Sequence, residues 1–195
     1  MNSNRPSDED WLVDHYEFIR NCSPQPINIL ELGCSSGRDT VHLVKLGNVI
    51  ATDIRVESLE KCARRVSDAT LLSLDLSQPL PFNNDSFGFI LASLSIHYFP
   101  WDVTERIVDE MKRCLSPVGG CIVRVNSSND KNYGASSEDY IEPNYYRVGT
   151  KTKRFFDLES IQRLFHDWHV RLVTERQIDR YRKNKWVWEV MLSAA

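Results

Sequence analysis

A turn of small residues follows a short apolar run near the start of the chain, in the stretch 27–37 (INILELGCSSG). The turn consists of Gly33, Cys34, Ser35, Ser36 and Gly37, and Glu31 precedes it. Small residues let the backbone approach a ligand closely, and a turn between a strand and a helix places that ligand at the helix N-terminus. We therefore expect a nucleotide-like ligand at the start of a helix over 38–46.

The spacing of the glycines separates two kinds of nucleotide site. A dinucleotide fingerprint, G-x-G-x-x-G, would need glycine at positions 35 and 38, where the chain has Ser35 and Arg38. The chain instead has the pattern E-x-G-x-S-x-G from Glu31 to Gly37. This argues against an NAD-type dehydrogenase, which stays open as an alternative.

Two acidic residues end later apolar runs. Asp53 closes the run 48–53 and lies 20 positions after Gly33, the spacing at which a carboxylate accepts hydrogen bonds from ribose hydroxyls. Asp75 lies near the end of the run 70–76. We expect Asp53 to bind a ribose.

Predicted strands and helices alternate along the first two thirds of the chain. The predicted strands are 27–32, 48–53, 70–76, 87–94 and 121–125, and the predicted helices between them are 38–46, 56–67 and 102–115. Such alternation is typical of a parallel sheet with right-handed crossovers. A helix over 157–165 and two late strands, 169–178 and 186–193, follow, and the polar turn 180–185 (RYRKNK) makes the strands a hairpin.

These features resemble the class I S-adenosylmethionine-dependent methyltransferases, and among them the small "type 11" methyltransferase domain. The first motif of that class is (E/D)-x-G-x-G-x-G, and Ser35 replaces its middle glycine here. Asp53, Asp75-Leu76, the loop LPFNNDSF (80–87) and the turn SPVGG (116–120) extend the resemblance over about half of the chain. It implies an α/β, Rossmann-like, doubly wound fold: a mostly parallel seven-stranded sheet with an antiparallel last strand and helices on both faces.

The resemblance also implies a cofactor, S-adenosylmethionine, with S-adenosylhomocysteine as product. The residues implied to hold it are Glu31, Gly33, Cys34, Ser35 and Gly37 in the turn, Asp53 and Ile54 after the second strand, Asp75 and Leu76 after the third, and Ser93 and Leu94 at the end of the fourth. For Glu31 and Asp75, capping of neighbouring backbone amides is the alternative role.

His97 follows the fourth strand, where this class presents groups that face the substrate. An imidazole with an ordinary pKa near ~6.5 could deprotonate an acidic nucleophile there. Packing inside the loop is the alternative. Methyl transfer is an in-line displacement that depends mainly on positioning, so it does not require a base.

The segment 126–153 is too long for an ordinary connection and carries several aromatic residues. Because it follows the fifth strand, we interpret it as a substrate lid over the carboxyl end of the sheet, with an idle surface insertion as the alternative. The candidate substrate contacts are Tyr133, Tyr140, Tyr145, Tyr146 and Arg147. A basic cluster, Arg147, Lys151, Lys153 and Arg154, either receives an anionic substrate or forms a solvated face.

The N-terminal part, 1–26, is expected to form a helical cap that begins at Ser7. One stripe of that helix carries Trp11, Leu12, His15, Tyr16 and Ile19. We expect a structural role, in which this helix packs on the sheet edge. The alternative is that Trp11 or Tyr16 faces a ligand.

Composition limits the remaining possibilities. A chain of 195 residues is expected to be a single domain, and its net charge of −3 argues against a nucleic-acid partner. Five cysteines without a C-x-x-C pair favour a reducing cytoplasm and predict no metal site. No apolar stretch approaches the ~20 residues of a membrane helix.

We therefore expect a cytoplasmic methyltransferase that acts on a small molecule. The alternatives are a non-catalytic methyltransferase-like binding or partner protein, and an RNA or protein methyltransferase that docks through the turn 180–185. The acceptor and the oligomeric state are not predicted.

Overall fold

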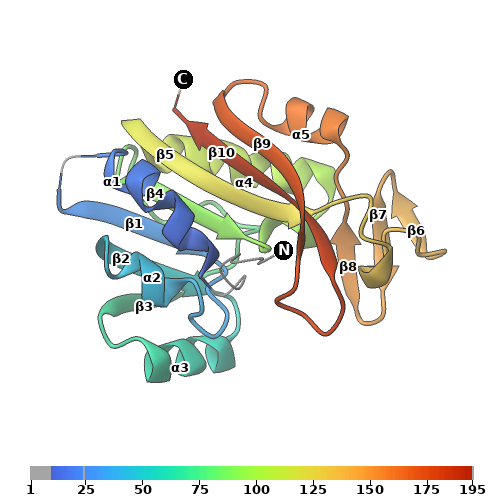
Figure 1. The fold of residues 1–195 in the computed structure, drawn as a ribbon, viewed down its shortest axis with the longest axis horizontal. Helices are drawn as coiled ribbons and strands as arrows, with labels where there is room; N and C mark the ends of the chain where they lie inside the picture. The colour runs from blue at the N-terminus through green and yellow to red at the C-terminus, as the bar shows by residue number, and fades with distance from the viewer. Residues whose placement is uncertain (1–9, 24, 195) are drawn as a thin grey trace, which may run out of the picture.

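The computed structural model describes residues 10–23 and 25–194, and its centre is a seven-stranded sheet (Figure 1). The strands are β1 (Ile27–Leu32), β2 (Gly47–Asp53), β3 (Ala69–Ser73), β4 (Phe87–Ser93), β5 (Leu115–Asn126), β9 (His169–Ile178) and β10 (Lys185–Ser193). Their order is β3-β2-β1-β4-β5-β10-β9. Strands β1 to β5 are parallel, whereas β10 runs antiparallel to both of its neighbours. The predicted fold class is confirmed.

Helices cover both faces of this sheet because side chains alternate along each strand. Ile27 and Ile29 pack with residues of η1 (Trp11–His15), α1 (Tyr16–Arg20), α2 (Thr40–Leu43) and α3 (Val56–Arg65). Leu30 and Leu32 point the other way and pack with residues of α4 (Trp101–Cys114) and α5 (Leu158–Leu164). The sheet thus separates two apolar cores.

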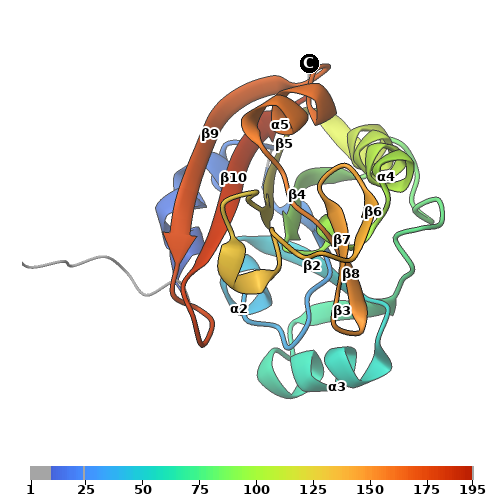
Figure 2. The ribbon, with the colours of Figure 1, turned by 90° about the vertical axis from the view of Figure 1, so that its right-hand side faces the viewer.

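The segment 126–153 is not the irregular loop that the sequence predicted. It contains a short helix η3 (Lys131–Tyr133) and strands β6 (Tyr140–Glu142) and β7 (Tyr145–Val148), which form an antiparallel sheet with β8 (Lys151–Arg154). The prediction missed them because the strands are only three or four residues long. Figure 1 shows this small sheet apart from the main sheet, and Figure 2 shows it beside α4.

Several predicted boundaries also differ from the structure. The helix predicted over 38–46 is shorter in the structure and spans Thr40–Leu43. At its end the hydrogen bonds join residues three apart, as between Leu46 N–H and the Leu43 carbonyl oxygen, instead of the four-residue spacing of an α-helix. Strand β3 ends at Ser73 rather than at 76. The stretch 116–120, expected as a turn, belongs to β5. The pairing register with β4 shifts there, because Phe87 pairs with Leu115 and Phe89 pairs with Gly120.

The N-terminal cap is a short 3-10 helix, η1, that continues into α1. Trp11, Leu12, His15 and Ile19 are buried in this cap, as their spacing predicted. Its expected start at Ser7 lies outside the described residues. No helix within 10–23 and 25–194 is long and apolar enough to cross a membrane.

Candidate active site

A cavity of about 700 Å³ lies at the carboxyl ends of β1, β2 and β4. Strand β1 pairs with β2 on one side and with β4 on the other, so the connections that follow these strands leave towards opposite faces of the sheet. Open α/β sheets bind ligands at such a switch point. The volume falls within the roughly 300–1,000 Å³ that small-molecule sites occupy.

The turn after β1 forms one wall of this cavity with Gly33, Cys34, Ser35 and Ser36. Gly33 has a φ of +82°, and a Cβ atom added there would lie 2.6 Å from the Cβ of Ser95. Ser35 has a φ of +51°, the left-handed conformation that glycine adopts most easily. Ser35 therefore keeps the backbone shape that the usual middle glycine of the motif would have.

Asp53, at the end of β2, faces this turn across the cavity wall. Its Oδ2 accepts a hydrogen bond from the backbone N–H of Ser35 at 3.0 Å, and its Oδ1 accepts one from Arg55 N–H at 2.9 Å. The Arg55 side chain adds an ion pair at 3.6 Å. A carboxylate has about four lone-pair positions, so Asp53 keeps the capacity to accept from ligand hydroxyls.

Asp75 and Leu76 line the cavity further along the same edge. Asp75 Oδ1 accepts from the backbone N–H of Ser77 at 2.9 Å, which is the amide-capping alternative, yet the residue remains on the cavity wall. Ile54 also lines the wall and is 61% exposed.

Ser93 and Leu94 line the cavity from the end of β4. Leu94 has a φ of +57°, and its N–H donates to the carbonyl oxygen of Arg124 at 2.8 Å. A left-handed non-glycine residue on a cavity wall is the kind of strain that gathers at functional sites.

Glu31 and Gly37 do not line the cavity but lie behind the turn. Glu31 is buried and accepts a hydrogen bond from Thr40 Oγ1 at 2.6 Å. Burial raises the pKa of its carboxyl to about 8, and the nearby charge of Asp39 adds to the shift. At Gly37, an added Cβ would lie 2.8 Å from the Cys62 sulfur, so the glycine lets α3 pack against the turn.

His97 is buried in η2 (Ile96–Tyr98) and does not lie on the cavity wall. Its ring centre is 4.2 Å from that of Tyr98, which does line the cavity. Burial lowers the pKa of His97 well below its ordinary value, and the charges of Lys185, Lys153 and Lys151 add to this effect. The His97 ring is therefore buried against Tyr98, and its lowered pKa favours the neutral imidazole.

The predicted lid, 126–153, contributes Lys151 to the cavity wall, which was not among the five candidate substrate contacts. None of Tyr133, Tyr140, Tyr145, Tyr146 and Arg147 lines the described wall, whereas Lys151 of β8 does. The Tyr145 hydroxyl instead donates to the backbone carbonyl oxygen of Tyr98 at 2.9 Å, and Thr152 Oγ1 donates to the same oxygen at 3.1 Å. The small sheet is thus fastened to the segment that follows β4.

The turn between β9 and β10 closes another side of the cavity with Arg180 and Tyr181. The Arg180 guanidinium forms a 3.1 Å ion pair with Asp39, which also lines the wall. We did not predict these residues as ligand contacts. The available signal was strand direction: β9 runs parallel to β1, so the turn after it lies at the same sheet edge as the Gly33 turn.

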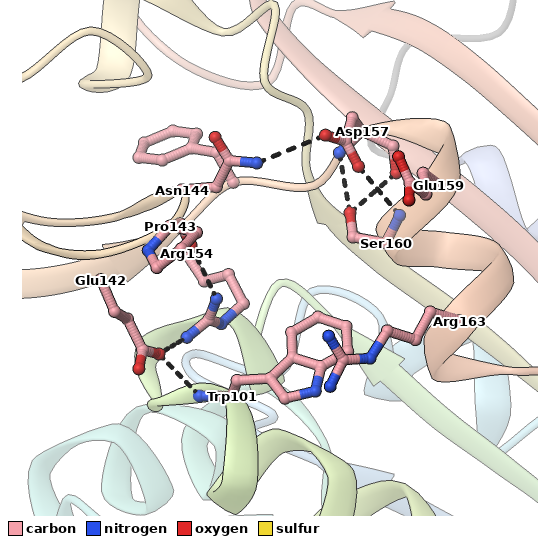
Figure 3. Close-up of a pocket in the computed structure, with 10 residues that line it drawn as sticks. Trp101, Glu142, Pro143, Asn144, Arg154, Asp157, Glu159, Ser160 and Arg163 are labelled. Carbon is pink, nitrogen blue, oxygen red and sulfur yellow. Dashed lines mark hydrogen bonds and ion pairs between the residues drawn. The ribbon is translucent and has the colours of Figure 1, made fainter.

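A second cavity of about 340 Å³ lies between the small sheet, α4 and α5 (Figure 3). Glu142 Oε1 accepts from the backbone N–H of Trp101 at 2.8 Å and forms an ion pair with the buried Arg154. The Arg163 guanidinium stacks over the Trp101 ring at 4.6 Å. These contacts join the small sheet to the start of α4, and the start of α4 to the last turn of α5.

Comparison with known proteins shows what this architecture is similar to. Residues 29–119, just under half of the chain, match the family model described as a methyltransferase domain. The matched segment contains the Gly33 turn, Asp53, Asp75 and Leu94, whereas Lys151 and Arg180 lie beyond it.

Solved structures resemble this chain beyond the matched segment as well. An S-adenosylmethionine-dependent methyltransferase from Methanosarcina mazei has a TM-score of 0.72 at 19% identity, over 91% of this chain and 96% of its own. The 1,6-didemethyltoxoflavin-N1-methyltransferase of Burkholderia thailandensis, solved with 1,6-didemethyltoxoflavin and S-adenosylhomocysteine, has a TM-score of 0.70 at 16% identity, over 96% and 80%.

A third similar structure is an S-adenosylmethionine-dependent methyltransferase from Clostridium acetobutylicum, with a TM-score of 0.72 at 16% identity, over 99% of this chain and 94% of its own. At these identities the likeness establishes the shared fold.

Proposed function

We propose that this chain transfers a methyl group from S-adenosylmethionine to a small molecule by in-line displacement. The observation that carries the proposal is the meeting of Ser35, Asp53, Asp75 and Leu94 on the wall of one cavity at the switch point of the sheet. These residues lie at or just after the ends of four different strands, and the resemblance implied each of them from its motif.

The residues on the wall fit the cofactor. Asp53 would accept hydrogen bonds from the ribose hydroxyls, and Ile54 and Leu76 offer apolar surface for the adenine. Glycine at position 33 lets the turn pack against Ser95, because a side chain there would collide with it. Gly33, Cys34 and Ser35 line the cavity and are available to the methionine part of the cofactor. When bound, S-adenosylmethionine supplies an electrophilic methyl group on a sulfonium.

The contribution of the protein is then to position an acceptor and to exclude water. Well-oriented reactants gain up to ~7–11 kcal/mol of the barrier from positioning alone. Tyr98, Phe99, Lys151 and Tyr181 lie on the cavity wall outside the predicted cofactor contacts, so we assign them to the acceptor end. The segment 126–153 and the cap within 1–26 act as covers of a single domain.

A small acceptor is supported by the size and the walls of the cavity. The Burkholderia thailandensis structure, which has both 1,6-didemethyltoxoflavin and S-adenosylhomocysteine bound, supports a small molecule as the acceptor. We also propose a cytoplasmic location, because all five cysteines are free thiols.

Calorimetric titration with S-adenosylmethionine and S-adenosylhomocysteine tests the proposal. We expect binding that Asp53→Ala weakens by about a hundredfold, since it removes a charged acceptor of two hydroxyls. Asp109→Ala, on the exposed surface of α4, is the matched control and should bind as wild type does. If wild-type protein binds neither compound, the enzyme proposal fails and a non-catalytic binding protein takes its place.

A base role for His97 stays a prediction. Because His97 contacts the Tyr98 ring and does not line the cavity, we expect His97→Gln to leave the affinity for S-adenosylhomocysteine unchanged. An unchanged kcat with the true acceptor would remove His97 from the mechanism.

A further inference from the structure

Carboxylates already neutralise part of the positive charge on the cavity wall. Arg55 forms an ion pair with Asp53 at 3.6 Å, and Arg180 forms one with Asp39 at 3.1 Å. Lys151 differs, because no carboxylate of residues 10–23 and 25–194 forms an ion pair with it. Arg38 also lines the wall and has an interaction of its own. The ammonium group of Lys151 is a charge on this wall that a ligand can pair.

The other cations of the basic cluster predicted from the sequence are engaged elsewhere. Arg147 pairs with Asp139 at 3.4 Å on the surface, and Arg154 pairs with Glu142. The Lys153 ammonium donates to the backbone carbonyl oxygen of Tyr133 at 3.2 Å. Of these four residues, only Lys151 lines the described cavity wall.

An aromatic side chain lies close to Lys151. Its ammonium lies 5.3 Å from the centre of the Tyr98 ring, and Phe99 and Tyr181 belong to the same cavity wall. Aromatic walls favour a planar ligand that can stack against them.

We propose that the methyl acceptor is an aromatic carboxylate, whose carboxylate pairs with Lys151 while its ring lies against Tyr98 and Tyr181. This inference rests on the proposed function and names the substrate class of the same site. A single unpaired ammonium matches a single negative charge, whereas a phosphate dianion would call for a fork of arginines or a nest of backbone amides. Lys151 is therefore a residue that determines specificity.

The test uses two probes that share a ring and a hydroxyl and differ in charge, 4-hydroxybenzoate and 4-hydroxybenzamide. Protein saturated with S-adenosylhomocysteine is titrated with each by calorimetry. We expect the benzoate to bind at least about tenfold more tightly, the usual effect of one charge-assisted hydrogen bond. Lys151→Gln should remove this preference, and Lys151→Arg should keep most of it.

Lys45→Gln is the matched control, because it makes the same charge change on an exposed residue outside the cavity wall. It should keep the preference for the benzoate. Equal binding of the two probes, binding of neither, or an undiminished preference in Lys151→Gln would each overturn the proposal.

Titration with S-adenosylhomocysteine alone separates this inference from the proposed function. Its affinity should be the same in wild type and Lys151→Gln. A tenfold loss in the variant would mean that Lys151 binds the carboxylate of the cofactor product, and it would overturn the assignment to the acceptor. If the wild-type protein does not bind S-adenosylhomocysteine, the proposed function fails. The two probes are then titrated into protein without cofactor. Equal binding of the two probes there would also overturn the proposal that Lys151 binds a carboxylate.

Discussion

Arg180 and Asp39 form a 3.1 Å ion pair on the cavity wall, although 141 residues separate them in the chain. The Nε1 of Trp11 donates to the same carboxylate at 3.2 Å. The N-terminal cap, the turn before α2 and the turn between β9 and β10 therefore meet at one carboxylate. Both members of the pair are largely shielded from water, so the interaction is weakly screened.

We expect Asp39→Asn to loosen the turn between β9 and β10 and to speed the dissociation of S-adenosylhomocysteine severalfold. Removing one partner of a nearly buried ion pair costs roughly 2–4 kcal/mol of unfolding free energy. Stopped-flow fluorescence and urea denaturation at pH 6.5 measure the two effects. Asp179→Asn, an exposed residue next to Arg180, is the control, and identical behaviour of the two variants would contradict the prediction.

The hydroxyl of Tyr145 provides a test of how the small sheet is held. Tyr145→Phe removes its bond to the Tyr98 carbonyl oxygen and should lower the free energy of unfolding by about 1 kcal/mol. We expect faster amide exchange across β7 and β8, measured by mass spectrometry. Tyr140→Phe, 60% exposed on β6, is the matched control and should change neither quantity. Unaltered exchange in Tyr145→Phe would show that the bond does not hold the sheet.

Glu31 should make stability depend on pH. Its pKa is raised from 4.5 to about 8 by burial, so the folded protein keeps a proton that the unfolded chain releases. The free energy of unfolding should therefore fall as pH rises from about 4.5 to about 8, by at most about 1.4 kcal/mol per pH unit for this group.

Glu31→Gln cannot titrate but keeps an oxygen that accepts from Thr40. Relative to wild type, this variant should become progressively more stable between pH 5 and pH 8, with little further change above that range. Urea denaturation at several pH values measures the difference, in which the other titrating groups largely cancel. Parallel profiles of the two proteins would show that Glu31 has no raised pKa.

The fold and much of the cavity wall could be predicted because their signals are local in sequence. The run 27–37 contains the strand and its turn, and Asp53 and Asp75 each lie at or just after a strand end. The alternation of strands and helices predicts a parallel sheet. Because parallel strands have their carboxyl ends at one edge of the sheet, the alternation also predicts that these residues lie close together.

Hydrophobic periodicity was sufficient to predict the main sheet, its helices and the acidic residues at the switch point, because it reports which face of each element is buried. It could not predict that Lys151, Arg180 and Tyr181 share a cavity wall with Ser35, or that the His97 ring lies against Tyr98. Those contacts join turns and short strands far apart in the chain, where no periodicity constrains the geometry. The basic cluster shows the same limit. Lys151 lines the cavity, whereas Arg147, Lys153 and Arg154 form their contacts elsewhere, and only the packed structure shows this difference.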